Sequence, residues 1–356
     1  MITYISLQEG AIHVIDFRSD TVTKPTEQMM RAINKAELGD DGRVNSEGKG
    51  EDPTVNKIEA MAARLTGKED ALFCNSGTMA NLVALLTYTK RNEQIAVDAF
   101  SHIYQSEKSI FMEEYFGRKP VLYKSDTRGK PILTTVDTTI KKGAALVCLE
   151  NTFSHKGGTC MSAEETNLFC ERAHTFGIPI HLDGARIFNA AAYVNESVEE
   201  LVASTTSVQF CLSKGLGAPI GSMLCGSKTF IFKARKVRKL IGGGMRQAGI
   251  IAAAGIEALQ NLQCIKEDHA KTLLLFSLIK AQPNVFLLNN VESNIIIIDL
   301  TPGKLVAIDV ERALAKKGLQ VKVISEKELR MTVHKDITEQ DIKRASIHIN
   351  TFFHNI

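Results

Sequence analysis

Three short segments of the chain contain side chains that could together form a cofactor site. The first is Ser76-Gly77-Thr78, which follows an apolar run and opens a helical pattern. The unpaired backbone N–H groups and the positive dipole of a helix N-terminus suit a phosphate group. The glycine allows a ligand to approach the backbone closely. The same three residues also fit an ordinary turn and helix cap, so this segment alone does not identify a ligand.

The second segment is 180–184 (IHLDG), in which Asp183 ends an apolar run. A carboxylate at the end of a buried strand needs a partner, because burial of an isolated charge is costly. A protonated pyridine nitrogen could be that partner. The alternative is that Asp183 caps the following helix.

The third segment is 213–219 (SKGLGAP), in which Ser213 and Lys214 follow an apolar run and precede two glycines and a proline. Most lysines are exposed surface charges, but one held between a buried strand and a constrained loop can serve as an amine nucleophile. The three segments together match a pyridoxal-phosphate (PLP) site, with a lysine for the aldehyde, an aspartate for the ring nitrogen and a helix start for the phosphate.

Alternating strands and helices are expected to position these segments. Buried strands are predicted at 71–74, 95–97, 146–149, 178–182 and 208–212, and helices at 26–36, 54–66 (with Thr54 as N-cap), 79–87, 164–176 and 198–203. This alternation predicts an α/β fold with a mostly parallel sheet covered by helices. Four of the strands end in polar side chains, namely Asp98, Glu150 with Asn151, Asp183, and Ser213 with Lys214. Ligands of such sheets bind at the strand C-termini, so a site is expected there.

The pattern of apolar and polar residues changes after about residue 265. A long helical stretch is followed by apolar runs at 293–300, 321–324 and 329–334, with helical patterns at 309–317 and 340–352. We therefore predict an N-terminal extension at 1–14, a large cofactor-binding domain at 15–264 whose first segment lies near the active site, and a small α+β domain at 265–356.

Composition excludes several classes of function. The 356 residues are 44% hydrophobic and carry a net charge of +3 with both signs interspersed, so no nucleic-acid-binding face is predicted. The most basic stretch, 233–239, is interpreted as a solvated helix face. Seven dispersed cysteines without a CxxC pair favour a reducing compartment. We expect no signal peptide at residues 1–14, no membrane span and no metal site, and hence a cytoplasmic protein.

The sequence resembles the low-specificity L-threonine aldolases, which are fold-type-I PLP enzymes. The matching segments follow the order of the family and cover most of the chain from residue 15, and they are DFRSDTVTKPT (16–26), GEDPTVN (50–56), SGTMAN (76–81), HIY (102–104), HLDGARIFNAA (181–191), CLSKGLGAPIGS (211–222) and GGGMRQAGI (242–250).

The resemblance implies a role for each candidate residue. Lys214 would bind the cofactor covalently, Asp183 would hold the pyridinium proton, and His102 would stack on the ring. The phosphate would be bound by Ser76, Gly77, Thr78 and Ser213, and by Arg246 from the neighbouring subunit. Ser19, Arg186 and Arg330 would bind the substrate α-carboxylate, with Arg186 also bordering the cofactor, because the planar guanidinium can bind a carboxylate bidentately.

The implied reaction is cleavage of L-threonine, L-allo-threonine and related β-hydroxy-α-amino acids to glycine and an aldehyde. His102 is a candidate for removing the β-hydroxyl proton, although its role could be purely structural. The family also implies a homotetramer built as a dimer of dimers.

Two departures from the family affect the substrate prediction. Eight residues, 42–49, separate GDD from GEDPT where the family has a short link with a tyrosine, and the usual ENTH motif reads ENTF, with Phe153 at its fourth position and His155 two residues later. Two alternatives stay open. One is a PLP-dependent β-eliminating lyase that releases pyruvate, and the other is a binding or assembly protein that kept the scaffold but lost activity.

Overall fold

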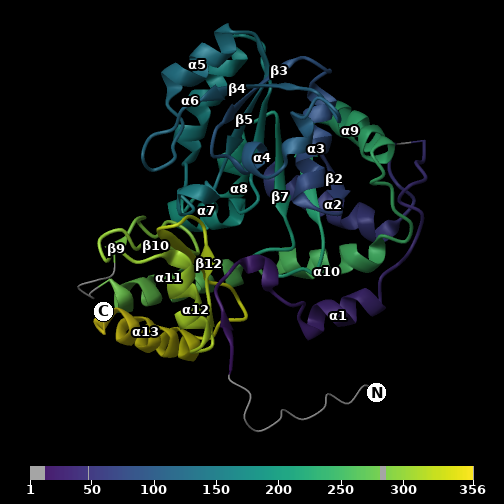
Figure 1. Cartoon of the computed structure of the whole chain (residues 1–356). Helices are drawn as coiled ribbons and strands as arrows, with labels where there is room; N and C mark the ends of the chain where they lie inside the picture. Colours follow the sequence, from purple (N-terminus) through teal and green to yellow (C-terminus); the bar gives the residue numbers. More distant parts are fainter. Residues whose placement is uncertain (1–12, 47, 281–285, 356) are drawn as a thin grey trace.

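The computed structural model describes residues 13–46, 48–280 and 286–355. These residues form a larger unit built on a central sheet and a smaller unit that contains the C-terminus (Figure 1). The predicted N-terminal extension lies outside the described residues except for His13 and Val14.

The larger unit is built on a seven-stranded sheet in the order β2-β8-β7-β6-β5-β3-β4. Its strands are β2 (Asp70–Cys74), β3 (Gln94–Asp98), β4 (Lys119–Tyr123), β5 (Ala144–Glu150), β6 (Ile180–Asp183), β7 (Ser207–Cys211) and β8 (Ser222–Gly226). Only β8 pairs antiparallel with its neighbours, β2 and β7. The prediction of a mostly parallel sheet is therefore confirmed.

Helices cover both faces of this sheet. They are α1 (Glu27–Asn34), α2 (Pro53–Thr66), α3 (Gly77–Tyr88), α4 (His102–Gln105), α5 (Leu133–Lys141), α6 (Ala163–His174), α7 (Ile187–Val194), α8 (Val198–Val202), α9 (Lys228–Leu240) and α10 (Gly249–Gln260), with 3-10 turns η1 (Asp20–Val22), η2 (Lys108–Ile110) and η3 (Ser154–Lys156). Side chains of α3, α4 and α9 pack on one face, and those of α1, α2, α5 to α8 and α10 pack on the other.

Strand β2 illustrates why these apolar runs become central strands. Alternate side chains of a strand point to opposite faces. Ala71 and Phe73 pack into the core shared with α2 and α10, whereas Leu72 and Cys74 pack into the core shared with α3 and α9. All four are fully buried, so a continuous apolar run is favoured over an alternating one.

The smaller unit has a four-stranded antiparallel sheet in the order β12-β13-β10-β9. Its elements are α11 (Gln263–Ile279), β9 (Phe286–Leu287), β10 (Ile295–Asp299), α12 (Ala307–Ala315), β11 (Leu319–Gln320), β12 (Lys322–Val323), β13 (Glu328–Thr332) and α13 (Glu339–His354).

Two segments connect the units. Strand β1 (Ile15–Asp16) pairs in parallel with β11, so the start of the described chain adds to the core of the smaller unit. Helix α11 begins against the larger unit through Cys264 and Ile265 and ends in the smaller unit's core at Ile279. These connections bring the N-terminal segment next to both units.

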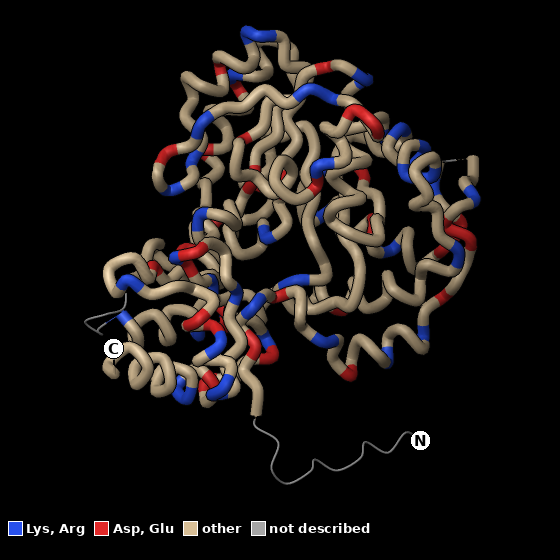
Figure 2. Tube along the Cα trace, in the orientation of Figure 1, with Lys and Arg blue, Asp and Glu red and all other residues tan. Residues whose placement is uncertain are grey.

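The interpretation of the basic stretch 233–239 as a solvated face is wrong for its two arginines. Arg235 and Arg238 are 4% and 1% exposed on the inner side of α9. Arg238 donates to Asp41 at 2.7 Å, and Arg235 donates to Glu59 at 2.7 Å. The three lysines of the stretch are exposed. Along the whole described chain, basic and acidic residues are interspersed (Figure 2).

Several local predictions also need correction. Helix α2 is capped by Asp52, whose side chain accepts from the backbone N–H of Val55 at 3.0 Å, and not by Thr54. The five strands predicted before residue 265 are present within two residues, but β4 and β8 were not predicted, nor were α4, α5, α7 and α10, and α9 was indicated only by the helical stretch 233–239. Among the described residues, no helix is long and apolar enough to cross a membrane.

Candidate active site

Six of the predicted cofactor residues line one pocket of about 140 Å³ at the C-terminal ends of β6 and β7. They are Gly77, Thr78, His102, Asp183, Ser213 and Lys214. Sheet topology explains the convergence, because β6 and β7 are parallel neighbours and end at the same edge. Of the other predicted strand ends, Asp98 instead accepts from the backbone N–H of Phe100 at 2.7 Å and from the Ser125 hydroxyl at 2.6 Å.

Lys214 lies in the turn that leaves β7. Its carbonyl accepts from the backbone N–H of Gly217 at 2.8 Å and from the Thr23 hydroxyl at 3.2 Å, so the backbone of the lysine is held. Among the described residues, its amine has no hydrogen bond or ion pair. A half-buried, unpaired amine at a pocket wall suits covalent bonding to an aldehyde.

Asp183 is held by neutral donors. Its Oδ2 accepts from the Asn81 side chain at 3.0 Å, while Oδ1 accepts from the Gln209 side chain and from the backbone N–H of Ala185 at 3.1 Å. The carboxylate does not cap α7, which has no side-chain cap. Asp183 therefore fits a partner in the pocket, such as a protonated ring nitrogen, better than the helix-cap alternative.

The start of α3 supplies a candidate phosphate cradle. Ser76 is the helix cap, and its hydroxyl accepts from the backbone N–H of Met79 at 3.1 Å, so the turn-and-cap interpretation also holds. The first N–H groups of a helix have no partner within it, which leaves those of Gly77 and Thr78 for a ligand. A Cβ on Gly77 would lie 2.8 Å from the Cys211 sulfur, so glycine is required there.

His102 begins α4 at the side of the pocket. Its backbone N–H donates to Glu150 at 2.8 Å, and its Nδ1 lies 3.0 Å from Glu107 Oε1. The hydrogen bond to Glu107 raises the pKa of His102, with a further contribution from Asp183. The imidazole thus lines the pocket and is tied to the buried Glu107, while the backbone of the same residue is tied to the buried Glu150.

Arg186 is already occupied by a carboxylate of its own chain. Its Nε and Nη2 donate to Asp20 at 2.7 and 2.6 Å, and its Nη1 donates to the Ser154 hydroxyl at 3.0 Å. Burial opposes the charge on Asp20, but the attraction of Arg186 outweighs it and holds the pKa of Asp20 well below its usual value. Ser19, the residue before Asp20, caps η1 by accepting from the backbone N–H of Thr21.

Arg330 of β13 is the less satisfied of the two arginines. Its Nη2 donates to the Arg18 carbonyl at 3.3 Å, and its buried Nε has no partner among the described residues. Burial, followed by the like charge of Arg186, lowers the pKa of Arg330 to about 10. This guanidinium has donors available for an incoming carboxylate.

Arg246 is not brought to the pocket of its own chain. It is exposed in the turn between α9 and α10 and pairs with Asp40 at 3.1 Å. A contact between Arg246 and the cofactor would therefore require a second copy of the chain.

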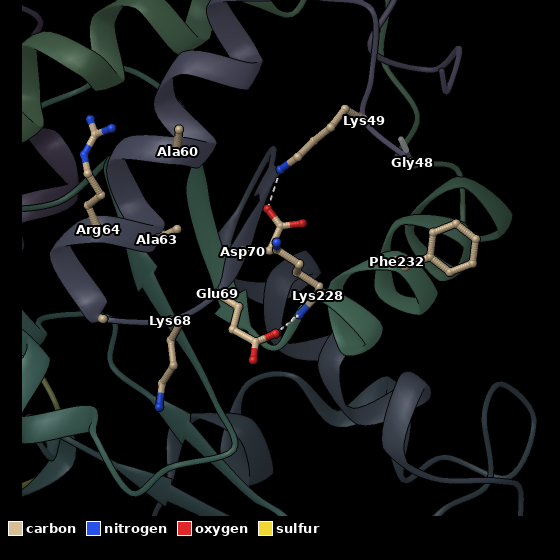
Figure 3. Close-up of a pocket in the computed structure, with 11 residues that line it drawn as sticks. Gly48, Lys49, Ala60, Ala63, Arg64, Lys68, Glu69, Asp70, Lys228 and Phe232 are labelled. Carbon is tan, nitrogen blue, oxygen red and sulfur yellow. Dashed lines mark hydrogen bonds and ion pairs between the residues drawn. The ribbon is translucent and has the colours of Figure 1, made fainter. Parts of the chain in front are cut away.

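None of the described residues of the loop 42–49 lines this pocket. Gly48 and Lys49 border a separate pocket of about 740 Å³ between α2, the start of β2 and α9 (Figure 3). There Lys49 pairs with Asp70, the first residue of β2, whereas the candidate site follows the last residue of that strand. The amine of Lys68 points out of this hollow and donates to three backbone carbonyls near the end of α8.

Phe153, at the position of the family's usual histidine, is 3% exposed and packed in the core. His155 is exposed in η3, which is held by Glu150 through the backbone N–H of Ser154 at 3.0 Å. Burial lowers the pKa of His155, and the positive charges of His102 and Arg330 lower it further. His155 therefore faces the same region as these two side chains.

Four residues of the site were missed from sequence: Asp20, Asn81, Glu107 and Gln209. Asp20 and Asn81 lie inside the family-like segments, so their position was a usable signal, whereas nothing local distinguishes Glu107 or Gln209. His102, Glu107 and Asp183 place ligand atoms within 4.8 Å of one another, a spacing that could hold a metal ion. The hydrogen bonds of these three side chains account for the cluster without a metal ion.

The chain is similar in sequence and in fold to known proteins. A family model described as "Beta-eliminating lyase" matches residues 16–301. Low-specificity L-threonine aldolase 1 of Arabidopsis thaliana is 38% identical over 340 residues, covering 92% of this chain and 93% of that protein.

Two solved structures share the fold. A threonine aldolase from Leishmania major has a TM-score of 0.79 at 16% identity, covering 95% of this chain and 99% of that one. A variant serine palmitoyltransferase from S. paucimobilis that contains bound PLP has a TM-score of 0.73 at 17% identity, covering 95% of this chain and 87% of that one. The predicted fold-type-I architecture is confirmed.

Proposed function

This chain belongs to the β-eliminating lyase family and, within it, to the low-specificity L-threonine aldolases, and from this membership we propose its reaction. The chain is a PLP-dependent carbon–carbon lyase that cleaves L-threonine and related β-hydroxy-α-amino acids, L-allo-threonine among them, to glycine and an aldehyde. The observation that carries the proposal is the shared pocket in which the unpaired amine of Lys214 and the carboxylate of Asp183 meet.

The residues present fit the cofactor. Lys214 would hold the aldehyde carbon, Asp183 the ring nitrogen, and the start of α3 with Ser213 the phosphate. When bound, PLP supplies the electron sink for the bond that breaks at the substrate α-carbon.

The remaining steps follow from side chains of this chain. Arg330 binds the substrate α-carboxylate and thereby fixes the orientation of the Cα–Cβ bond that is cleaved. His102 takes the β-hydroxyl proton at Nε2, because its Nδ1 is engaged by Glu107. Arg186 positions the carboxylate-binding site by fixing Asp20 and Ser154, because each of its three nitrogens already donates to one of these side chains.

The test is release of acetaldehyde from L-threonine by the purified protein with PLP, coupled to an alcohol dehydrogenase and NADH. We expect equal amounts of acetaldehyde and glycine. Release of 2-oxobutyrate and ammonia from L-threonine, without glycine, would support the second candidate, a β-eliminating lyase, which the description of the matching family favours. A protein that binds PLP but releases none of these products would contradict both.

We further propose a cytoplasmic homotetramer, a dimer of dimers. Arg246 supports assembly because it is exposed and does not line the pocket of its own chain. The seven unpaired, buried cysteines support a reducing compartment.

A further inference from the structure

Glu107 and Asn81 form a buried network with His102 and Asp183 that the aldolase reaction above does not by itself require. Glu107 lies between α4 and η2 and is 8% exposed, and Asn81 lies on α3 and is 1% exposed. The Asn81 amide nitrogen donates to Glu107 Oε2 at 3.1 Å and to Asp183 Oδ2 at 3.0 Å. One amide group therefore links the carboxylate behind the histidine to the carboxylate at the ring-nitrogen position.

The donors and acceptors of this network fix its orientation. An amide nitrogen has two hydrogens, and both are used by carboxylates. The Asn81 oxygen must then accept, and it lies 3.0 Å from His181 Nε2. Burial lowers the pKa of His181 to about 4, so this ring is neutral with its proton on Nε2, and its Nδ1 accepts from the Ser207 hydroxyl at 2.9 Å.

The same logic fixes the proton on His102. A carboxylate is only an acceptor, so the 3.0 Å contact with Glu107 requires a proton on Nδ1 of His102. Its Nε2 has no hydrogen-bond partner among the described residues, and the ring lines the pocket. The titratable groups around this ring are Glu107, Asp183 of β6, Lys214 after β7, Glu150 of β5 and His155 of η3.

We propose that Glu107 is the positioning residue that orients His102, keeps its Nδ1 protonated and leaves Nε2 as the atom that exchanges protons with substrate, and that Asn81 locks Glu107 in place against Asp183. The proposal rests on the aldolase function for the substrate proton, but the orientation of His102 is a property of the protein alone. Because Glu107 is the main group that stabilises the proton on His102, its removal changes the titration of that ring and not only the stability of the fold.

The test compares Glu107→Gln with the wild type and with Glu114→Gln, a matched control at an exposed position of the following loop. Imidazole nitrogen shifts of His102 in the ¹⁵N-histidine-labelled full chain, assigned with His102→Asn, report its tautomer and pKa. We expect Nδ1–H in the wild type and a pKa lower by about one unit or more in Glu107→Gln, as for loss of an adjacent opposite charge. Glu107→Asp, which keeps the charge, should stay closer to the wild type, and Glu114→Gln should match it.

Kinetics provide the second measurement. In Glu107→Gln, the acid limb of the pH profile of kcat should move to lower pH. The value of kcat should be about 10-fold lower while KM is nearly unchanged, because weaker base catalysis affects the chemical step. An unchanged limb, or a wild-type His102 with its proton on Nε2, would overturn the proposal, and the wild-type spectrum decides even where the variant fails to fold. If the wild type releases no aldehyde, the aldolase function fails while the spectrum still tests the orientation of His102.

Discussion

Single residues of the site differ in how many of their polar atoms the protein has already satisfied. The amine of Lys214 has no partner among the described residues, whereas the donors of Arg186 are all directed at Asp20 and Ser154. This difference separates residues that can bond to a ligand from residues that hold the site in shape.

Lys214→Ala is expected to abolish turnover, with kcat lower by at least about 10³-fold, because the covalent bond to the cofactor is lost. Acetaldehyde release measures this directly, and Lys236→Ala on the exposed side of α9 is the control. Turnover by Lys214→Ala at the wild-type rate would refute the assignment of the catalytic lysine.

Substitution of Arg330 is expected to affect substrate binding, whereas substitution of Arg186 is expected to affect the stability of the fold. Arg330→Lys should raise KM for L-threonine about 10-fold, because lysine cannot bind a carboxylate bidentately. Arg186→Met should leave Asp20 as an unpaired buried charge and lower the free energy of unfolding by about 3–5 kcal/mol. Steady-state kinetics and urea unfolding of both variants test this, and a stability loss confined to Arg330→Lys would reverse our assignment.

At the scale of elements, α9 is held to the larger unit by buried ion pairs rather than by an apolar stripe alone. Arg238 bonds to Asp41 and also to the Phe73 carbonyl of β2, so it links the helix, a loop and the sheet. The same contact anchors Asp41, which is fully buried.

Arg238→Met is expected to lower the free energy of unfolding by about 3–5 kcal/mol, because the buried Asp41 loses its main partner. Lys236→Met, two residues away and exposed, should change it by less than about 0.5 kcal/mol. Urea unfolding of the two variants under the same conditions provides the comparison. Equal effects would show that α9 is held by its apolar contacts.

Helix α11 contains a buried carboxylate, Asp268, that should make stability depend on pH. Burial raises the pKa of Asp268 to about 7, although Lys271 opposes this. Between its unfolded value near 4 and 7, the folded chain binds more protons than the unfolded chain. This contribution to stability is therefore lost as the pH rises through 7.

Asp268→Asn should accordingly stabilise the protein at pH 8, by on the order of 1–3 kcal/mol, and have a smaller effect at pH 5. Urea unfolding at the two pH values measures the difference. A variant that is equally or more destabilised at pH 8 than at pH 5 would contradict the buried-carboxylate argument.

For the whole molecule, the central question is whether one chain makes a complete site. The described chain gathers Lys214, Asp183 and His102 in one pocket but leaves Arg246 on its surface beside Asp40. A dimer in which each subunit donates Arg246 to the other pocket would complete the phosphate site that the family implies.

Subunit mixing tests this arrangement. Lys214→Ala and Arg246→Ala should each have little activity, but co-expressed chains should form mixed dimers in which one pocket is intact, for about one quarter of wild-type activity. Lys214→Ala mixed with Asp183→Asn is the control, because both residues line the pocket of the same chain and no intact site can form. If the mixture of Lys214→Ala and Arg246→Ala is as inactive as the control mixture, Arg246 does not contribute to the pocket of the other subunit.

The sequence by itself determined the buried strands and the strand ends at which Asp183 and Lys214 lie, and the resemblance to the aldolases added His102, which lines the same pocket. These features are local, because burial on both faces requires apolar runs and the site follows them directly. Only the tertiary structure decided that Asp20 occupies Arg186, that Arg235 and Arg238 point inward, and that Asn81 joins Glu107 to Asp183. Those contacts join residues 26 to 197 positions apart. Because a buried charge is defined by the partner that folding brings to it, no local pattern specifies them.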